Sequence, residues 1–252
     1  MALFDNTPAV LDAAWAIAAG QLADGSAIAS RAQGYTATSA TSGKAIYATT
    51  YTPQGADAQR SIKSGNVNDT AAGTGARQVL LTYLTATFEL KTEILTLNGT
   101  TAVATAASDI AFVESLTVVS VGSGGGNAGT ITFHTNNSGG GTTWASIAAS
   151  DNQTFWAHHY VPAGRTCLLL SVNTGATVVA GQTTVNVIEN LALATSPQLQ
   201  RGMALVHAAV NSWSYEFRVP LAVPGPSLIW LVERPVAATA STAVAGFEYL
   251  QF

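Results

Sequence analysis

The segment Glu93-Ile94-Leu95-Thr96-Leu97-Asn98-Gly99-Thr100-Thr101 decides the fold class. Its first five residues have the composition and length of a short strand. The dipeptide Asn98-Gly99 follows at once, and it favours a two-residue type I′ turn, which needs positive φ at both central positions. The segment therefore predicts an antiparallel hairpin and indicates a β protein.

Short strands separated by turn residues continue from about residue 44 to the end of the chain. Breaks rich in Gly, Asn or Pro separate them, and no second long helix falls between them, which argues against parallel βαβ units. The predicted fold class is all-β: an antiparallel β-sandwich or jelly roll with a short amino-terminal helix and an extended arm. The expected strands are residues 45–52, 78–84, 93–97, 101–105, 113–121, 130–134, 143–148, 154–161, 166–172, 184–190, 205–210, 213–219, 227–233 and 243–250.

Residues 8–19 are the one good helix candidate, with Pro8 suited to the first helical position and an apolar face along one side. This face either packs on its own domain or docks on a neighbouring subunit. The segment 25–43, which is weakly patterned and rich in Ala, Ser and Thr, favours the second interpretation. The candidate partner contacts are therefore Val10, Leu11 and Trp15 on this face, together with the carboxyl-terminal Phe252.

The expected domain organisation is a helix and arm in residues 1–65, followed by a β-sandwich region in residues 66–252. A break near residues 195–205 would divide the second part into two β subdomains. The carboxyl-terminal stretch 247–252 is apolar to its end, and such an ending is normally tied into a sheet.

The chain is poor in charge. Of its 252 residues, 10 are Lys or Arg and 14 are Asp or Glu, whereas an average composition of roughly 25% would give about 63 charged residues. A net charge of −4 excludes a polybasic nucleic-acid binder. Charged side chains guard strand edges against association, so their scarcity predicts an obligate homo-oligomer, and we expect a closed trimer.

Cys167 is the single cysteine, so an intrachain disulfide and a cysteine-based zinc site are both excluded. Its place in an apolar run predicts a small buried side chain. The first residues have neither a basic region nor an apolar stretch of signal-peptide length, and we expect a protein made without a signal peptide. No apolar window is long enough to span a membrane, so no membrane partner is expected.

No pattern of residues predicts a catalytic, cofactor-binding or metal-binding site. Gly124-x-Gly126-x-x-Gly129 matches a dinucleotide fingerprint, but that motif works only before a helix. Here it leads into the alternating segment 130–133, which is typical of a strand. A flexible hairpin loop is therefore the expected structure.

The histidines and paired carboxylates give no stronger signal. His158 and His159 are adjacent, so they would point to opposite faces of a strand and could not share a metal ion without a bulge. Glu89 and Glu93 are four residues apart in a strand-like region, which predicts a solvated pair rather than an acid/base dyad. We therefore expect no enzymatic activity.

Aromatic residues mark two strands. Residues 154–161 carry aromatic side chains on both faces, which predicts a strand buried on both. Trp213, Tyr215 and Phe217 line one face of residues 213–219, which is typical of a half-buried strand. Core packing is the preferred interpretation of these three rings, and a carbohydrate platform is the alternative.

Three segments carry a resemblance to a known family: the stretch Asn68-Asp69-Thr70-Ala71-Ala72-Gly73-Thr74-Gly75-Ala76-Arg77, the strand at 79–84 and the hairpin at 93–101. They resemble segments of virion structural proteins of tailed bacteriophages. In these proteins an NDT-x-AGTGAR turn precedes a strand, and an E-x-x-x-LNGTT hairpin follows it. The similarity continues through 109–113 and 122–131, and it covers roughly residues 66–173. These motifs mark turns and not a binding site.

The resemblance implies a non-enzymatic virion protein with no cofactor. We expect a capsid cement (decoration) protein that binds copies of itself and the major capsid protein, stabilises the head from the capsid surface, and is made in the host cytoplasm. A tail or baseplate component is an alternative in the same class. A receptor-binding or carbohydrate-binding β-sandwich module is an alternative from a different class.

Overall fold

The computed structural model describes residues 28–38, 44–45, 56–178, 184–193, 198–207, 211–235 and 241–252. All regular structure in these residues is β, and every strand pairing is antiparallel, which confirms the predicted fold class. The expected helix, with Val10, Leu11 and Trp15, lies outside the described residues. Within them, no helix has the length and hydropathy needed to cross a membrane.

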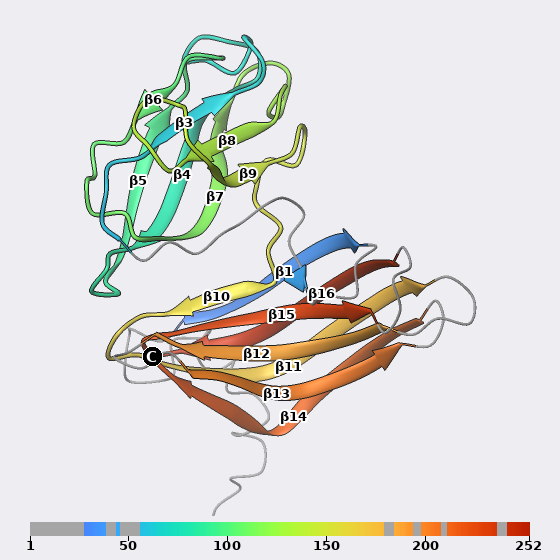
Figure 1. Cartoon of the computed structure of the whole chain (residues 1–252). Helices are drawn as coiled ribbons and strands as arrows, with labels where there is room; N and C mark the ends of the chain where they lie inside the picture. The colour runs from blue at the N-terminus through green and yellow to red at the C-terminus, as the bar shows by residue number, and fades with distance from the viewer. Residues whose placement is uncertain are drawn as a thin grey trace, which may run out of the picture.

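Two sheets pack face to face in the larger unit, which forms the lower part of Figure 1. The first sheet has the order β1 (Ile28–Thr38), β16 (Ser241–Gln251), β11 (Thr166–Val178) and β14 (Asn211–Pro224). The second has the order β10 (His158–Val161), β15 (Ser227–Pro235), β12 (Thr184–Ala192) and β13 (Gln198–His207), with β2 (Lys44–Ala45) also paired to β15.

The strand order identifies this unit as a jelly roll. When β1 and β10–β16 are counted as eight strands in chain order, the first sheet holds strands one, eight, three and six, and the second holds two, seven, four and five. This is the eight-stranded, double Greek-key arrangement of jelly rolls. The buried core between the sheets includes Leu169, Val172, Ile229, Leu231 and Phe247.

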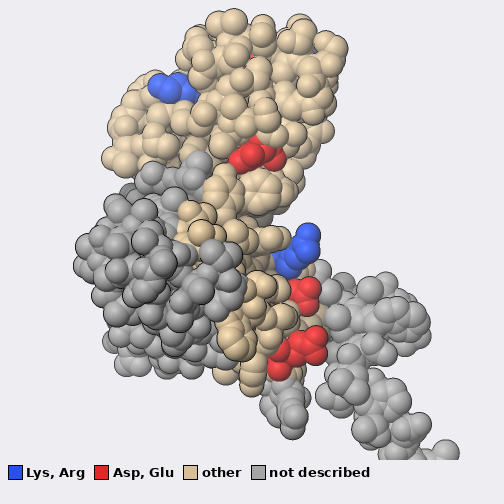
Figure 2. Space-filling view, turned by 90° about the vertical axis from the view of Figure 1, so that its right-hand side faces the viewer, with Lys and Arg blue, Asp and Glu red and all other residues tan. Residues whose placement is uncertain are grey.

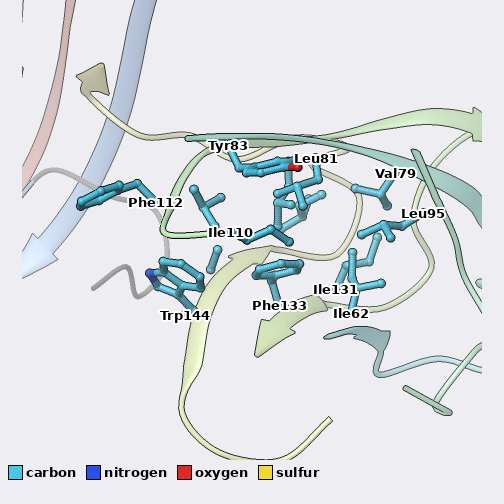
Figure 3. Packing of buried hydrophobic residues seen from close by; sticks show 14 of the residues in the cluster. Ile62, Val79, Leu81, Tyr83, Leu95, Ile110, Phe112, Ile131, Phe133 and Trp144 are labelled. Carbon is cyan, nitrogen blue, oxygen red and sulfur yellow. The ribbon is translucent and has the colours of Figure 1, made fainter. Parts of the chain in front are cut away.

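A smaller unit is inserted in the chain between β1 and β10. One of its sheets has the order β6 (Val103–Ala104), β3 (Ser61–Ser64), β8 (Ile131–His134) and β9 (Thr143–Ile147), and the other has the order β5 (Leu90–Thr96), β4 (Ala76–Leu84) and β7 (Phe112–Val121). Side chains from the two sheets, among them Ile62, Leu81, Phe133 and Trp144, point toward one another and form its core (Figure 3).

Three of the described strands, β1, β2 and β3, lie in residues 1–65, which were predicted to form a helix and arm. β1 is paired with β16 along its full length, from Ile28 opposite Gln251 to Thr38 opposite Ser241. β3 pairs with β8 and β6 inside the inserted unit. β13 runs across the expected break near 195–205 and pairs with β12. The division into an arm of residues 1–65 and a region of residues 66–252 stays a prediction.

The strands predicted at 93–97 and 101–105 do not form a hairpin, because β5 pairs with β4 and β6 pairs with β3 in the other sheet. The turn between them occurs one residue later than expected. The Thr101 amide donates a hydrogen bond to the Asn98 carbonyl at 3.1 Å, so Gly99 and Thr100 are the central residues. Gly99 has a φ of 59°, and Thr100 has no positive φ. The turn is therefore not of type I′, because that type needs positive φ at both central positions.

The chain is tied into the jelly roll at its carboxyl end. The backbone of Phe252 exchanges two hydrogen bonds with that of Thr166, at 3.0 and 3.2 Å, as the apolar ending predicts. The Phe252 ring remains 36% exposed. Cys167 is fully buried in the jelly-roll core, and burial raises the pKa of its thiol to about 12, which confirms its interpretation as a small core side chain.

Candidate functional site

A cleft of about 500 Å³ lies where the inserted unit meets the jelly roll. β1 and β10 run along the side of the jelly roll that faces the inserted unit (Figure 1). The inserted unit and the segment that follows it contribute Thr82, Ser115, Thr117, Gln153, Thr154 and Phe155. The jelly roll contributes Ser30, Arg31, Gln33, His159, Tyr249 and Gln251.

Glu114 on β7 reaches from the inserted unit into the jelly roll. Its Oε1 lies 2.7 Å from Nδ1 of His159, and its Oε2 accepts a hydrogen bond from the Tyr160 amide at 2.9 Å. The other ring nitrogen of His159 lies 2.7 Å from Oε1 of Gln251, and the ring stacks on Tyr249 at 4.1 Å between centroids. One carboxylate therefore joins two units through groups on β10 and, beyond them, β16.

His158 lies on the other face of β10, as the alternation of the strand predicts. Its Nε2 donates to the backbone carbonyl of Glu114 at 3.1 Å, and its ring packs between Trp156 and Tyr160 at 5.0 and 5.5 Å. The side chain is completely buried. The aromatic segment 154–161 is therefore buried on both faces near its end, as expected, although regular β structure begins only at His158.

Burial and charge set the ionisation of this cluster. Burial lowers the pKa of His158 to about 4, because the charged imidazolium loses its hydration. For Glu114, burial acts to raise the pKa, but its close interaction with His159 and the hydrogen bond from the Tyr160 amide outweigh burial and hold the pKa below its ordinary value. Glu114 is therefore a carboxylate and His158 a neutral ring at neutral pH.

The cluster is saturated by its own contacts. Glu114 is 15% exposed, and its two oxygens are already committed to His159 and the Tyr160 amide. No group of three His, Cys, Asp or Glu residues within the described ranges is arranged to hold a metal ion. This geometry can fix the inserted unit on the jelly roll, and its residues form part of the cleft wall.

A second hollow, of about 450 Å³, lies beside the first on the sheet β1-β16-β11-β14. It is lined by Arg31 and Gln33, which also line the junction cleft, and by Asn173, Ser212, Ser214 and Val244 among others. Gly175 and Gly246 also line the hollow, and a Cβ at Gly246 would lie 2.6 Å from the Ala32 carbonyl oxygen, so β1 approaches β16 closely at this glycine. The cross-strand pairs Gln33–Gly246, Gly246–Asn173 and Asn173–Ser214 place these residues in one row.

Two of the three aromatic residues of β14, Trp213 and Tyr215, are not core residues, contrary to the preferred interpretation. Trp213 is 53% exposed and Tyr215 46% exposed, while Phe217 is partly buried against the jelly-roll core. Their register partners Thr174 and Val172 on β11 are buried. The rings therefore have the inward orientation that alternation predicts, but β14 is the last strand of its sheet among the described residues, and two of them are left uncovered.

Asp69, in the turn motif at 68–77, accepts hydrogen bonds from the chain's own backbone. Its Oδ1 accepts hydrogen bonds from the amides of Ala76 and Ala128 at 2.7 and 2.8 Å. Its Oδ2 accepts from the Gly129 amide at 2.9 Å and the Ser64 hydroxyl at 2.5 Å. The buried carboxylate thus joins three segments of the inserted unit.

The glycine-rich loop packs against that turn, so it is not the flexible hairpin loop that was expected. The Gly122 amide donates to the Gly75 carbonyl at 2.8 Å, and the Gly124 amide donates to the Thr74 carbonyl at 2.7 Å. A Cβ at Gly122 would lie 2.2 Å from the Gly73 carbonyl oxygen, so this close backbone approach requires glycine. These glycines therefore serve packing between loops.

Glu89 and Glu93, which the sequence suggested as a pair, have separate partners. Glu89 is exposed and lies 3.3 Å from Nζ of Lys91. Glu93 accepts hydrogen bonds from the amides of Ala106 and Ala107 at 2.7 and 3.1 Å. They do not face a common point.

Comparisons with known proteins give only distant structural similarity. No protein-family model matches the chain, and no curated protein matches it. The chain is similar to the structure of infectious bursal disease virus Gt strain at 10% identity over 90% of this chain and 71% of that one, with a TM-score of 0.28. It is similar to the infectious bursal disease virus VP2 subviral particle at 8% identity over 89% of this chain and 73% of that one, with a TM-score of 0.23. Scores this low carry no conclusion about function, which must come from the residues of this chain.

One sheet face of the inserted unit carries no charged side chain and mixes apolar residues with Thr and Ser. By alternation, the outward positions of β5, β4 and β7, which the structure describes completely, carry no Lys, Arg, Asp or Glu. Ile94 is 59% exposed there, and Leu90, Val119 and Val121 are also exposed. Charged side chains are also few on the described surface that Figure 2 shows.

Proposed function

We propose that the chain is a non-enzymatic structural protein of a tailed-bacteriophage virion, and specifically a capsid cement (decoration) protein. It would assemble as a homotrimer on the capsid surface and bind the major capsid protein. The resemblance of the turn motifs at 68–77 and 93–101 to phage virion proteins supports the class. A jelly roll is compatible with it, since viral capsid proteins and lectins both use that fold.

The observation that carries the proposal is the uncharged sheet face of β5, β4 and β7. A monomeric protein ordinarily protects such a face with charged side chains, because exposed β-branched and apolar residues invite association. Here Ile94, Val119 and Val121 are instead exposed, and none of the three lines the junction cleft. A permanent contact with a neighbour removes this surface from water without desolvating an ion.

The proposed mechanism is repeated burial of small interfaces. Apolar surface removed from water contributes about 25 cal/mol per Å², and a standard interface takes roughly 800 Å² from each partner. Contacts of this size, repeated over a lattice, strengthen one another because each subunit is held at several points. A cement protein can therefore stabilise a capsid with no catalytic or ligand-binding chemistry.

We further propose that residues 1–25 act as an arm that docks on a neighbouring subunit through Val10, Leu11 and Trp15. The exposed ring of Phe252 is the fourth proposed partner contact. Deleting residues 1–25 should abolish capsid attachment while the β region stays folded by circular dichroism. Unchanged capsid occupancy by the shortened chain would rule out the arm.

Sedimentation velocity tests the uncharged face directly. The wild-type chain should sediment as a trimer, and the Ile94→Lys, Val119→Lys double variant should sediment as smaller species because it places two charges in the contact. Val67→Lys is a matched control, because Val67 is 68% exposed outside this face, and it should assemble as the wild type does. A wild-type chain that is monomeric at all concentrations would overturn the proposal.

A further inference from the structure

We propose that the two adjoining hollows beside β1 form one groove that binds a neutral oligosaccharide. The junction cleft and the second hollow share Arg31, Ala32 and Gln33, so they adjoin along one stretch of β1. Their volumes, about 500 and 450 Å³, are each in the range of ligand sites. An elongated groove of this kind suits a linear chain of rings. The inference does not depend on where the protein lies in a virion.

The hydrogen-bonding groups of the groove match sugar hydroxyls. Amide side chains come from Gln33, Gln153 and Asn173, all of them exposed, and each offers both donors and an acceptor. Further hydroxyl groups line it on Ser115, Thr117, Thr154, Ser212 and Ser214. A sugar hydroxyl is likewise both donor and acceptor, so it can form hydrogen bonds with these groups. An apolar ligand would leave them unpaired.

An aromatic surface is present where the groove passes β1. Phe155 lines the junction cleft and is partly exposed, and its ring centroid lies 6.2 Å from that of Tyr35 at an angle of 46°. Tyr35 is 40% exposed and is two residues from Gln33 on the same strand, so both have the same orientation. These rings offer apolar contact for the C–H face of a sugar ring, next to amides that can take its hydroxyls.

The charges around the groove select against an acidic glycan. Arg31 is the one cation among its described lining residues, and it stands opposite Glu248 on β16. Glu216 lies on the same sheet face, since Ser171 pairs with both Glu216 and Glu248, and Glu114 lies at the bottom of the cleft. Three carboxylates against one guanidinium disfavour an anionic ligand. The groove therefore suits an uncharged saccharide.

An array of immobilised neutral and acidic oligosaccharides, probed with the full-length chain, tests the inference. We expect binding to one or more neutral glycans and weaker or no binding to acidic ones. Phe155→Ala and, separately, Gln153→Ala should each weaken the affinity for the bound glycan by roughly tenfold, measured by titration calorimetry. Gln153 is exposed, so its variant should keep the wild-type fold even if the Phe155 variant does not.

A matched control lies outside the groove. Gln78→Ala removes an amide on β4 that does not line the groove, and it should not change the affinity. The inference is overturned by an array with no neutral glycan bound, by stronger binding of acidic glycans, or by full affinity in both groove variants. Trimer formation and the copy number in virions are measured in separate experiments. Failure of the glycan-binding proposal can therefore be distinguished from failure of the cement proposal.

Discussion

Replacing His158 by Phe should remove a large part of the acid sensitivity of the folded chain. The histidine side chain is completely buried, and burial lowers its pKa from 6.5 to about 4. The folded protein therefore takes up the proton less readily than the unfolded chain, and stability is lost as pH falls from about 6.5 toward 4. For these two pKa values the loss between pH 7 and pH 5 is about 2 kcal/mol.

Phenylalanine keeps a flat ring between Trp156 and Tyr160 but cannot titrate. It also loses the hydrogen bond to the Glu114 carbonyl, which costs about 1 kcal/mol at every pH. Urea unfolding at pH 7 and pH 5, followed by tryptophan fluorescence, gives the free energy of unfolding for each protein. The wild-type chain should lose about 2 kcal/mol more than His158→Phe over this interval.

The pH interval from 5 to 7 and the control variant are chosen so that the comparison reports the titration of His158 alone. The lowered pKa of Glu114 keeps its carboxylate charged in the folded state between pH 5 and pH 7, and its contribution is lost only below about 4.5. Burial also lowers the pKa of His134, but that contribution is common to wild type and variant. Tyr160→Phe is the control and should keep the wild-type pH dependence. Equal pH dependence in wild type and His158→Phe would refute the reasoning.

Two further predictions concern the stability of single sites. Asp69→Ala should cost about 3 kcal/mol or more in urea unfolding, because it leaves the amides of Ala76, Ala128 and Gly129 without their acceptor, and a loss below about 1 kcal/mol would contradict this role. Phe247→Ala should cost about 3–5 kcal/mol because the ring is 1% exposed in the core, whereas Trp213→Ala should cost less than about 1 kcal/mol. Equal losses at Phe247 and Trp213 would show that Trp213 is covered within the single chain.

The strands that the amino-acid sequence predicted well are those whose own pattern decides them. The segments predicted at 113–121, 130–134 and 227–233 combine β-branched or apolar residues with clear turn residues on either side, and they coincide with β7, β8 and β15 to within two residues at each end. β1 was missed because Ile28–Thr38 is rich in small and polar residues, and its strand conformation depends on pairing with β16, more than 200 positions away.

The candidate site could not be predicted because its groups come from distant parts of the chain. Glu114 and His159 are 45 residues apart and belong to different units, so no local spacing relates them. The one local signal was the presence of two histidines in a segment otherwise buried and aromatic, where a polar partner was needed. The exposure of Trp213 was equally hidden, because alternation predicts which face a residue occupies and not which strand ends the sheet.

Quantitative mass spectrometry of purified infectious particles tests the central claim most directly. The ratio of this chain to the major capsid protein measures its place in the virion. A cement protein should be present in numbers comparable with those of the capsid lattice it covers. The small number of copies that a tail or baseplate holds would contradict the cement role, and absence of the chain from the particles would contradict the virion proposal as a whole.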